Sequence, residues 1–548
     1  MSSLRVLFAL GLSSLLIVGS VWAEAPVITA LVPTGGQRGQ RVEVTVQGKL
    51  GTPPLSFWSD RPELQAEFPE KPDKTFTLII PDSTPPGVAL IRVVNAEGTS
   101  VLRPFEIGTL PEVNEQEPND DLDKSQKLDS SKLLINGVLE KSGDVDSFAV
   151  SLEQGQTLVA ALSSNRVFGT PLDAVLQIVS PEGFVLEQND DDRGNDPMIV
   201  FPVPQSGMYY VRAFGFPVAP NSSVRFSGGA DWIYRLTLTT GPYVDHLLPL
   251  SLPAGIDTSA RVYGWNLSDD LNQISLHQEV EVSEVLVSDS ANVVEVEGVP
   301  YPSLVEPSPD APPVASFPVS LSGQIASAGE IDSIRIAGKK GEAISCRVEA
   351  RELGSQLDPV LRLIDAEGTQ LAEVDDASRE NFDATLDYTP KADGELVLQI
   401  RDRFEHGGMR YYYRITISPP RKEFTLSVAS DSFKLDGVKP LEIPVTIGRD
   451  RGFDEPIEIK LEGLPEGVVS ATAVSEAKGD SSKKVTLKIE RGSVESFAGP
   501  MTILGTSTGD SKLTGTATIA VAGTARLSNQ LWLTFPAKPA EPEKTETE

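Results

Sequence analysis

The sequence predicts an all-β protein made of tandem β-sandwich domains. Short runs that alternate apolar and polar residues, the period of a half-buried strand, recur along the chain, whereas no stretch keeps apolar residues at the helical spacing of 3.6. The 45 glycines and 42 prolines are spread among these runs, and both residue types favour turns between short strands. A chain of 548 residues is too long for a single core, so we expect several domains.

The charge balance excludes one class of function. The chain carries 78 acidic against 47 basic residues, a formal net charge of −31, and the acidic excess is distributed along its length. Such a field repels nucleic acid and anionic lipid and favours cations or a basic partner. We therefore expect no nucleic-acid binding.

Residues 1–23 have the pattern of a secretory signal peptide. Arg5 precedes an apolar run from Val6 to Val18, and small or medium residues stand at the cleavage-determining positions of 21–23. A membrane anchor is the alternative, but the run of about 13 apolar residues is shorter than the roughly 20 that a spanning helix needs. We predict cleavage after Ala23, no membrane insertion after that cleavage, and a secreted or periplasmic product.

The single cysteine, Cys346, lies in a strand-like run. One cysteine cannot form an intrachain disulfide, so the stability of a secreted chain must come from its β cores, with or without bound metal. We expect Cys346 to be a buried, unreactive side chain.

Two short stretches, 24–111 and 241–312, share one pattern of turn residues. Each has a proline, a glycine turn and a glycine that closes an alternating strand, at a constant offset of 216 residues: Pro33 and Pro249, Gly39 and Gly255, Gly48 and Gly264. The pattern resembles the start of TIG-type immunoglobulin-like domains. We expect an immunoglobulin-like β domain at 24–111 and a short β module with a linker at 241–312.

Residues 112–240 contain eight or so short alternating strands, which predicts a β-sandwich or jelly roll. In the last of these strands the alternation places Tyr234, Leu236 and Leu238 in the core. Arg235, Thr237 and Thr239 are expected to face out.

The same block returns at 313–419. Matched positions lie 186 or 185 residues apart, including Gly137 and Gly323, Asp146 and Asp332, Gly155 and Gly341, Asp173 and Asp358, and Gly183 and Gly368. The first copy resembles the bacterial pre-peptidase C-terminal domain, which is related to the collagen-binding domains of clostridial collagenases. The resemblance is carried by Glu115, Glu117, Pro118, Asn119, Asp120, Gly137, Gly143, Asp144, Asp146, Phe148, Gly155, Leu172, Asp173, Pro181, Gly183, Asn189, Asp190, Asp191, Ser206, Gly207, Tyr209, Tyr210 and Val211.

The chain ends in a further β-unit and a tail. Alternating runs from 420 to 535 predict an immunoglobulin-like sandwich. Residues 536–548 contain mainly Ala, Pro, Glu, Lys and Thr, a composition typical of disorder.

Oxygen-bearing side chains gather just before and within the first large sandwich. Calcium takes six to eight oxygen ligands from carboxylates, amides and carbonyls, and the alternate side chains of an extended segment fall on one side. The candidate ligands are Glu115, Glu117, Asn119 and Asp120, with Asp144 and Asp146 from a facing loop. In the collagen-binding relatives the matching acidic segment binds calcium, and the resemblance implies that role here. The alternative is a solvated acidic linker.

Two other acidic stretches are weaker candidates. In the second copy Val305-Glu306-Pro307-Ser308-Pro309-Asp310 replaces the acidic cluster and Glu330 replaces Asp144, so we predict no tight site there. The loop 188–196 is rich in aspartate. Aspartate is common in turns, and a separate ion bound by this loop is the alternative.

Catalytic motifs are missing from the sequence. The three histidines, His246, His277 and His406, lie far apart, and no nucleophile elbow, zinc-protease helix or Cys-His pairing is present. We therefore predict a non-catalytic protein that binds an extracellular protein or polysaccharide. The alternatives are a structural spacer, an accessory protein of a secreted protease and, last, a cryptic hydrolase. Aromatic residues such as Tyr411, Tyr412 and Tyr413 are expected in cores, with a binding platform as the alternative.

Overall fold

The computed structural model describes residues 23–219, 225–306, 312–376, 378, 381–436, 439–521 and 523–537. The predicted signal peptide, apart from Ala23, and residues 538–548 of the predicted tail lie outside them. The described chain is almost entirely β, with one short helix, α1 (Asn165–Phe168), and three 3-10 turns (Asp269–Leu271, Arg351–Leu353 and Asp480–Ser482). The predicted fold class is confirmed. No helix of the described residues is long and apolar enough to cross a bilayer.

The N-terminal module spans residues 27–108 and packs two sheets around one core. Their strand orders are β1-β3-β6-β5 and β2-β9-β7-β4, with β8 beside β7. The strands are β1 (Val27–Val32), β2 (Gly35–Gln37), β3 (Arg41–Lys49), β4 (Ser56–Ser59), β5 (Gln65–Glu67), β6 (Thr75–Ile79), β7 (Gly87–Asn95), β8 (Gly98–Thr99) and β9 (Arg103–Gly108).

The first sandwich spans residues 112–239, with strand orders β10-β12-β19-β14-β17 and β11-β13-β18-β15-β16. Its core includes Phe148, Tyr209 and Tyr234, all at most 1% exposed. The strands are β10 (Glu112–Asn114), β11 (Gln126–Lys127), β12 (Lys132–Val138), β13 (Asp146–Leu152), β14 (Thr157–Ser163), β15 (Leu172–Val179), β16 (Val185–Asn189), β17 (Met198–Pro202), β18 (Gly207–Pro217) and β19 (Ile233–Thr239).

A middle module (residues 243–299) and a second sandwich (303–418) follow, each with two sheets. The middle module has the orders β20-β22-β23 and β21-β25-β24, and the second sandwich β26-β27-β34-β29-β32 and β28-β33-β30-β31. The strands are β20 (Tyr243–Leu248), β21 (Ser251–Pro253), β22 (Thr258–Trp265), β23 (Gln273–Leu276), β24 (Val282–Leu286), β25 (Val293–Val299), β26 (Ser303–Val305), β27 (Val319–Gln324), β28 (Ile331–Gly338), β29 (Ile344–Glu349), β30 (Pro359–Asp365), β31 (Gln370–Val374), β32 (Thr385–Tyr388), β33 (Gly394–Asp402) and β34 (Tyr412–Ser418).

The C-terminal module spans residues 423–535. Its main sheet path is β36-β45-β42-β43-β35-β37-β41-β39, and β38, β40 and β44 pair beside that path. The strands are β35 (Glu423–Ser427), β36 (Ser432–Lys434), β37 (Leu441–Asp450), β38 (Ile457–Glu462), β39 (Val469–Ala471), β40 (Ala473–Ser475), β41 (Lys484–Glu490), β42 (Phe497–Ser507), β43 (Thr514–Ala520), β44 (Leu527–Ser528) and β45 (Leu531–Phe535). Buried and exposed residues alternate strictly in β41, as the sequence pattern predicts.

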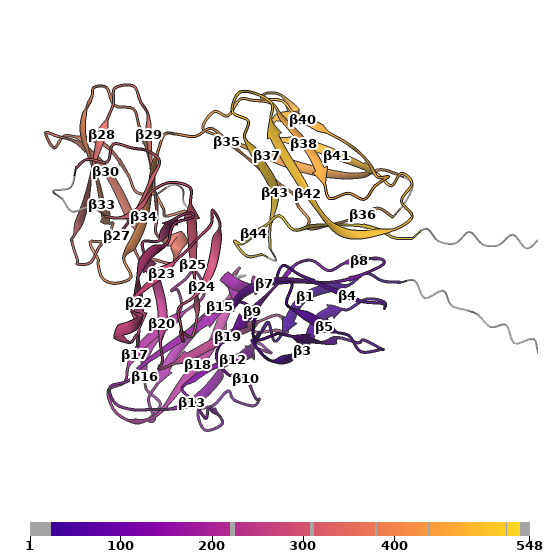
Figure 1. The fold of residues 1–548 in the computed structure, drawn as a ribbon. Helices are drawn as coiled ribbons and strands as arrows, with labels where there is room; N and C mark the ends of the chain where they lie inside the picture. Colours follow the sequence, from indigo (N-terminus) through magenta and orange to yellow (C-terminus); the bar gives the residue numbers. More distant parts are fainter. Residues whose placement is uncertain are drawn as a thin grey trace, which may run out of the picture.

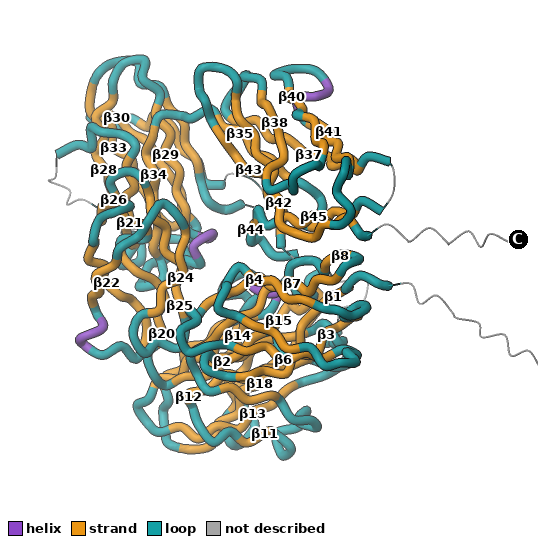
Figure 2. Tube along the Cα trace, turned by 45° about the vertical axis from the view of Figure 1, so that its right-hand side comes forward, coloured by secondary structure: helices purple, strands orange, loops and turns teal. Residues whose placement is uncertain are grey.

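The N-terminal and C-terminal modules contact each other. Figures 1 and 2 both place the C-terminal module beside the N-terminal module. Arg92, 1% exposed, lies over the rings of both Trp58 and Trp532, which meet edge to face, and donates to the carbonyl of Gln530 at 2.8 Å. Glu284 of the middle module joins this contact, since it binds Arg61 at 2.6 Å and Arg526 at 3.1 Å. The modules therefore fold back on themselves and do not form an extended string.

The last strand of the first sandwich corrects one expectation. Tyr234, Leu236 and Leu238 fill the core as predicted, but Arg235 and Thr239 are each only 1% exposed. They lie on the outer face of their sheet, which neighbouring parts of the chain cover. The alternation of apolar and polar residues identified the two faces of the strand. It could not show that other parts of the chain cover the outer face.

Candidate metal site

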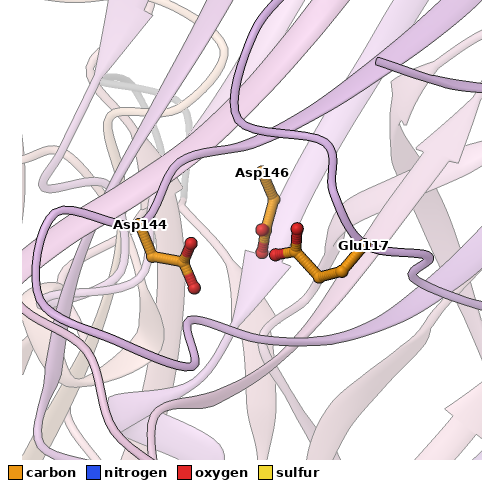
Figure 3. Close-up of side chains that lie close together, drawn as sticks. All are labelled: Glu117, Asp144 and Asp146. Atoms are coloured by element: carbon orange, nitrogen blue, oxygen red, sulfur yellow. The ribbon is translucent and has the colours of Figure 1, made fainter. Parts of the chain in front are cut away.

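Three carboxylates converge at one end of the first sandwich (Figure 3). One oxygen each of Glu117, Asp144 and Asp146 lies within 4.8 Å of the others. Glu117 lies in the segment between β10 and β11, Asp144 ends the turn after β12, and Asp146 opens β13. Asp144 and Asp146 are fully buried, whereas Glu117 is exposed. This group is the only one of its kind in the described part of the chain.

The turn that carries Asp144 is built locally. Gly143 has a φ of 88°, a left-handed conformation that glycine adopts without strain. Asp144 Oδ2 accepts a hydrogen bond from the backbone N–H of Glu140 at 2.5 Å. This bond orients the carboxylate and leaves Oδ1 for another partner.

Several polar atoms of this region lack a hydrogen bond although they are buried. They are Oδ1 of Asp146 and both amide atoms of Asn119, which is itself fully buried. Oδ1 of Asp144 is ion-paired with the exposed Lys141, whose Nζ lies 3.1 Å from it and 3.7 Å from Asp120 Oδ2. Unsatisfied buried polar atoms cost about 1–3 kcal/mol each, and the oxygens of Asp146 and Asn119 are acceptors that a cation could use.

Glu115 takes a different position from the one predicted. Its Oε1 accepts from the backbone N–H of Val138 at 2.7 Å, and its Oε2 lies 3.3 Å from the hydroxyl of Tyr234. That hydroxyl also contacts Asp146 Oδ2, at 2.6 Å. Glu115 therefore lies behind Asp146 and outside the converging group of three, as does Asp120.

The electrostatics of the site show excess negative charge. Burial, and then the proximity of Asp146, raise the pKa of Glu115. Burial raises the pKa of Asp146 to about 7, and that of Glu117 is also raised by burial. A divalent cation would relieve this repulsion.

The second sandwich keeps the supporting part of this arrangement. The hydroxyl of Tyr413 lies 2.9 Å from Asp332 Oδ2 and 3.1 Å from Glu306 Oε2, which reproduces the contacts of Tyr234 with Asp146 and Glu115. Glu330, at the position of Asp144, accepts from the N–H and hydroxyl of Ser327. Residues 307–310, where ligands were predicted to be too few, lie outside the described residues.

Asp332 gives the second sandwich a pH dependence of its own. Burial, and then Glu306, raise the pKa of Asp332 to about 8. Because the folded-state pKa exceeds the unfolded value of about 4, this group favours the folded state at low pH, and that advantage is lost between pH 4 and 8. We expect wild-type β34 amides to lose protection in hydrogen exchange from pH 5 to 8.5 relative to Asp332→Asn. If the difference in β34 protection between the two proteins is the same at pH 5 and pH 8.5, the raised pKa of Asp332 is contradicted.

The acidic loop 188–196 couples modules. Asp192 forms a paired contact with Arg410 of the second sandwich, and Asp245 of the middle module binds both Arg193 and Arg410. Arg410 and Asp245 were missed at the sequence level because only the fold brings them to this loop. Arg193 and Arg410 thus neutralise part of the loop's charge.

The histidines have no nucleophilic partners among the described residues. His246 is buried between the rings of Tyr263 and Tyr412, and its Nδ1 lies 2.9 Å from Asp245. His277 and His406 are exposed beside Asp257 and Asp402. Cys346 is fully buried, and burial raises the pKa of its thiol to about 12.

Comparisons with known proteins find a similarity in the centre of the first sandwich. The family described as the bacterial pre-peptidase C-terminal domain matches residues 144–215. A segment of 125 residues is 30% identical to a probable subtilase-type serine protease of Deinococcus radiodurans; it covers 23% of this chain and 16% of that relative. The second copy and the TIG-like resemblance stay predictions.

Two solved structures give only distant similarity. One is the Clostridium perfringens ZmpB catalytic domain with two CBM51 domains, at 10% identity over 73% of this chain and 55% of that chain, with a TM-score of 0.14. The other is Bacteroides ovatus SGBP-B in complex with a mixed-linkage heptasaccharide, at 9% identity over 71% and 73%, also with a TM-score of 0.14. At such TM-scores neither similarity supports a functional argument.

Proposed function

We propose that this chain is a non-catalytic, multidomain protein of the cell exterior or periplasm that binds an extracellular protein or polysaccharide. In this proposal the strand groups act as separate domains, and calcium stabilises the first sandwich. The observation that carries it is the convergence of Glu117, Asp144 and Asp146 with buried oxygens that lack hydrogen bonds.

The donor set fits calcium better than a transition metal. Glu117, Asp144 and Asp146 offer carboxylate oxygens, and Asn119 and Asp120 lie in the same segment as Glu117. Hard oxygen ligands without histidine or cysteine suit calcium, whereas zinc sites in proteins usually include nitrogen or sulfur. A bound ion would join the segment before the sandwich to the turn after β12 and so restrict the linker.

Three observations favour binding over catalysis. The matched family is named for its position beside peptidases, and the similar segment of the Deinococcus protein is a small part of that protease. No imidazole of the described residues hydrogen-bonds a serine or cysteine side chain. A role as accessory to a secreted protease is the second candidate, and the similarity to that protease segment favours it.

The contact among the N-terminal, middle and C-terminal modules argues against a simple spacer. A spacer made of several modules is longest when the modules are extended in a line. Here the N-terminal, middle and C-terminal modules meet at Glu284. The folded-back arrangement instead presents several modules on one body.

Calcium titration of the full chain tests the proposal. A ligand present at a hundred times its Kd stabilises the folded state by about 2.7 kcal/mol, so calcium is expected to raise the first-sandwich melting transition and to give binding heat. Glu117→Gln should lose both responses. Glu330→Gln, at the second-sandwich position that matches Asp144, should keep them. A wild-type protein with no heat and no shift would leave only the linker interpretation.

A further inference from the structure

Three aromatic side chains of the segment between β33 and β34 lie near one another. The ring centroids of Phe404 and His406 are 6.2 Å apart, and those of His406 and the half-buried Tyr411, which packs against the core, are 6.1 Å apart. Phe404 is 62% exposed, although transfer of such a ring from water is favourable by about 1.5–3 kcal/mol. We call these three side chains the aromatic platform. Sequence reasoning placed Tyr412 and Tyr413 correctly in the core but did not single out Phe404.

The fold holds this platform in place. The buried carboxylate of Asp402 accepts from the backbone N–H groups of Phe404 and His406, both at 2.9 Å. The carbonyl of Glu405 accepts from the N–H of Gly329 at 3.0 Å, and the N–H of Gly408 donates to Ile325 at 2.9 Å. A surface fixed before binding loses little conformational entropy on binding.

A charged group directly precedes Phe404 in the chain. Arg403, the residue before Phe404, places its guanidinium 2.9 Å from Asp375 and 3.3 Å from Asp376. The side chains of Arg403 and Asp375 are 42% and 52% exposed, so their remaining donors and acceptors face solvent. An exposed ring, next in the chain to an exposed carboxylate–guanidinium pair, matches a ligand with apolar C–H faces and many hydroxyl groups.

We propose that the aromatic platform is a binding site for a neutral polysaccharide. The inference rests on the proposed binding function and names its ligand class. Pyranose rings present C–H groups on their faces, which pack against aromatic rings, and hydroxyls at their edges, which reach Arg403 and Asp375. The formal charge of −31 makes an anionic polysaccharide a poor ligand, which selects a neutral one.

Binding of the full-length mature chain to polysaccharides tests this site. The probes are insoluble cellulose and chitin in pelleting assays, and soluble galactomannan, xylan and starch in affinity electrophoresis. At least one is expected to bind, and Phe404→Ala should weaken that binding at least tenfold. Phe184→Ala, which removes a ring that is 70% exposed on the first sandwich, should bind as the wild type does. Because both rings are exposed, unchanged melting curves are expected for both variants.

Three results would overturn the inference. They are binding of none of the five polysaccharides, equal binding by Phe404→Ala and wild type, and loss of binding in Phe184→Ala alone. Retention on gelatin that depends on Phe404 would assign the platform to a protein ligand and also reject the polysaccharide. The calcium titration is independent of this loop, so a negative polysaccharide result with an intact calcium response would reject only the platform.

Discussion

Replacing Arg235 by alanine should destabilise the first sandwich by about 3–5 kcal/mol, because it removes one partner of a buried ion-pair cluster. The guanidinium is 1% exposed and lies 2.8 Å from Glu106 of the N-terminal module and 2.8 Å from Glu112. It also donates to Asn136 at 2.6 Å. The variant leaves these groups without their cation. Hydrogen exchange of β12 and β19 should accelerate, and a protease should cut between the N-terminal module and the first sandwich.

The second sandwich supplies a matched control. Arg414 follows Tyr413 as Arg235 follows Tyr234, and it binds Glu349 at 2.8 Å and Glu297 of the preceding module. Glu297 is 39% exposed and its counterpart Glu106 is 28% exposed, and the side chain of Arg414 is 8% exposed against 1% for Arg235. Solvent therefore screens more of the Arg414 cluster, and Arg414→Ala should cost less. Equal effects of the two variants, or an unaffected first sandwich in Arg235→Ala, would contradict the buried-cluster argument.

The sequence predicted what depends on local pattern. Strand alternation and turn residues predicted the all-β class, which the described residues confirm. Tyr234 and Tyr413 lie in strands at similar places in the two sheet orders, but the second family copy stays a prediction. The sequence pattern could not predict the contacts between modules. Arg235 and Arg410 look like ordinary surface arginines in an alternating strand or loop, and only the packing of distant segments buries them.

The sequence anticipated part of the convergence of carboxylates, whereas calcium binding there stays a proposal. An extended acidic segment places alternate side chains on one side, which identified Glu117, and the turn before β13 supplied Asp144 and Asp146. The spacing could not show that Glu117 joins the converging carboxylates and Glu115 does not, because this depends on which distant side chain each one contacts. Glu115 meets the buried hydroxyl of Tyr234, which comes from the far end of the domain sequence.

Replacing Asp146 by asparagine should change stability in opposite directions with and without calcium. In chelator the wild type keeps Asp146 close to Glu115 and Asp144, and burial and repulsion raise its pKa. The amide removes one charge from this group and keeps an oxygen to accept from Tyr234, so the variant should be the more stable protein. With saturating calcium the wild type gains binding free energy that the variant largely lacks, and the order should reverse.

Hydrogen exchange of β13 and β19, measured in chelator and in calcium, reports this reversal for the first sandwich alone. Single-domain readout matters because a multidomain chain does not unfold in one step. Asp332→Asn, at the corresponding position of the second sandwich, removes a carboxylate from the equivalent Tyr413 contact and should stabilise its sandwich equally in both solutions. If the wild type is more stable than Asp146→Asn by the same margin in chelator and in calcium, the carboxylate of Asp146 is only a structural acceptor. The repulsion among these buried acids would then have no ion to offset it.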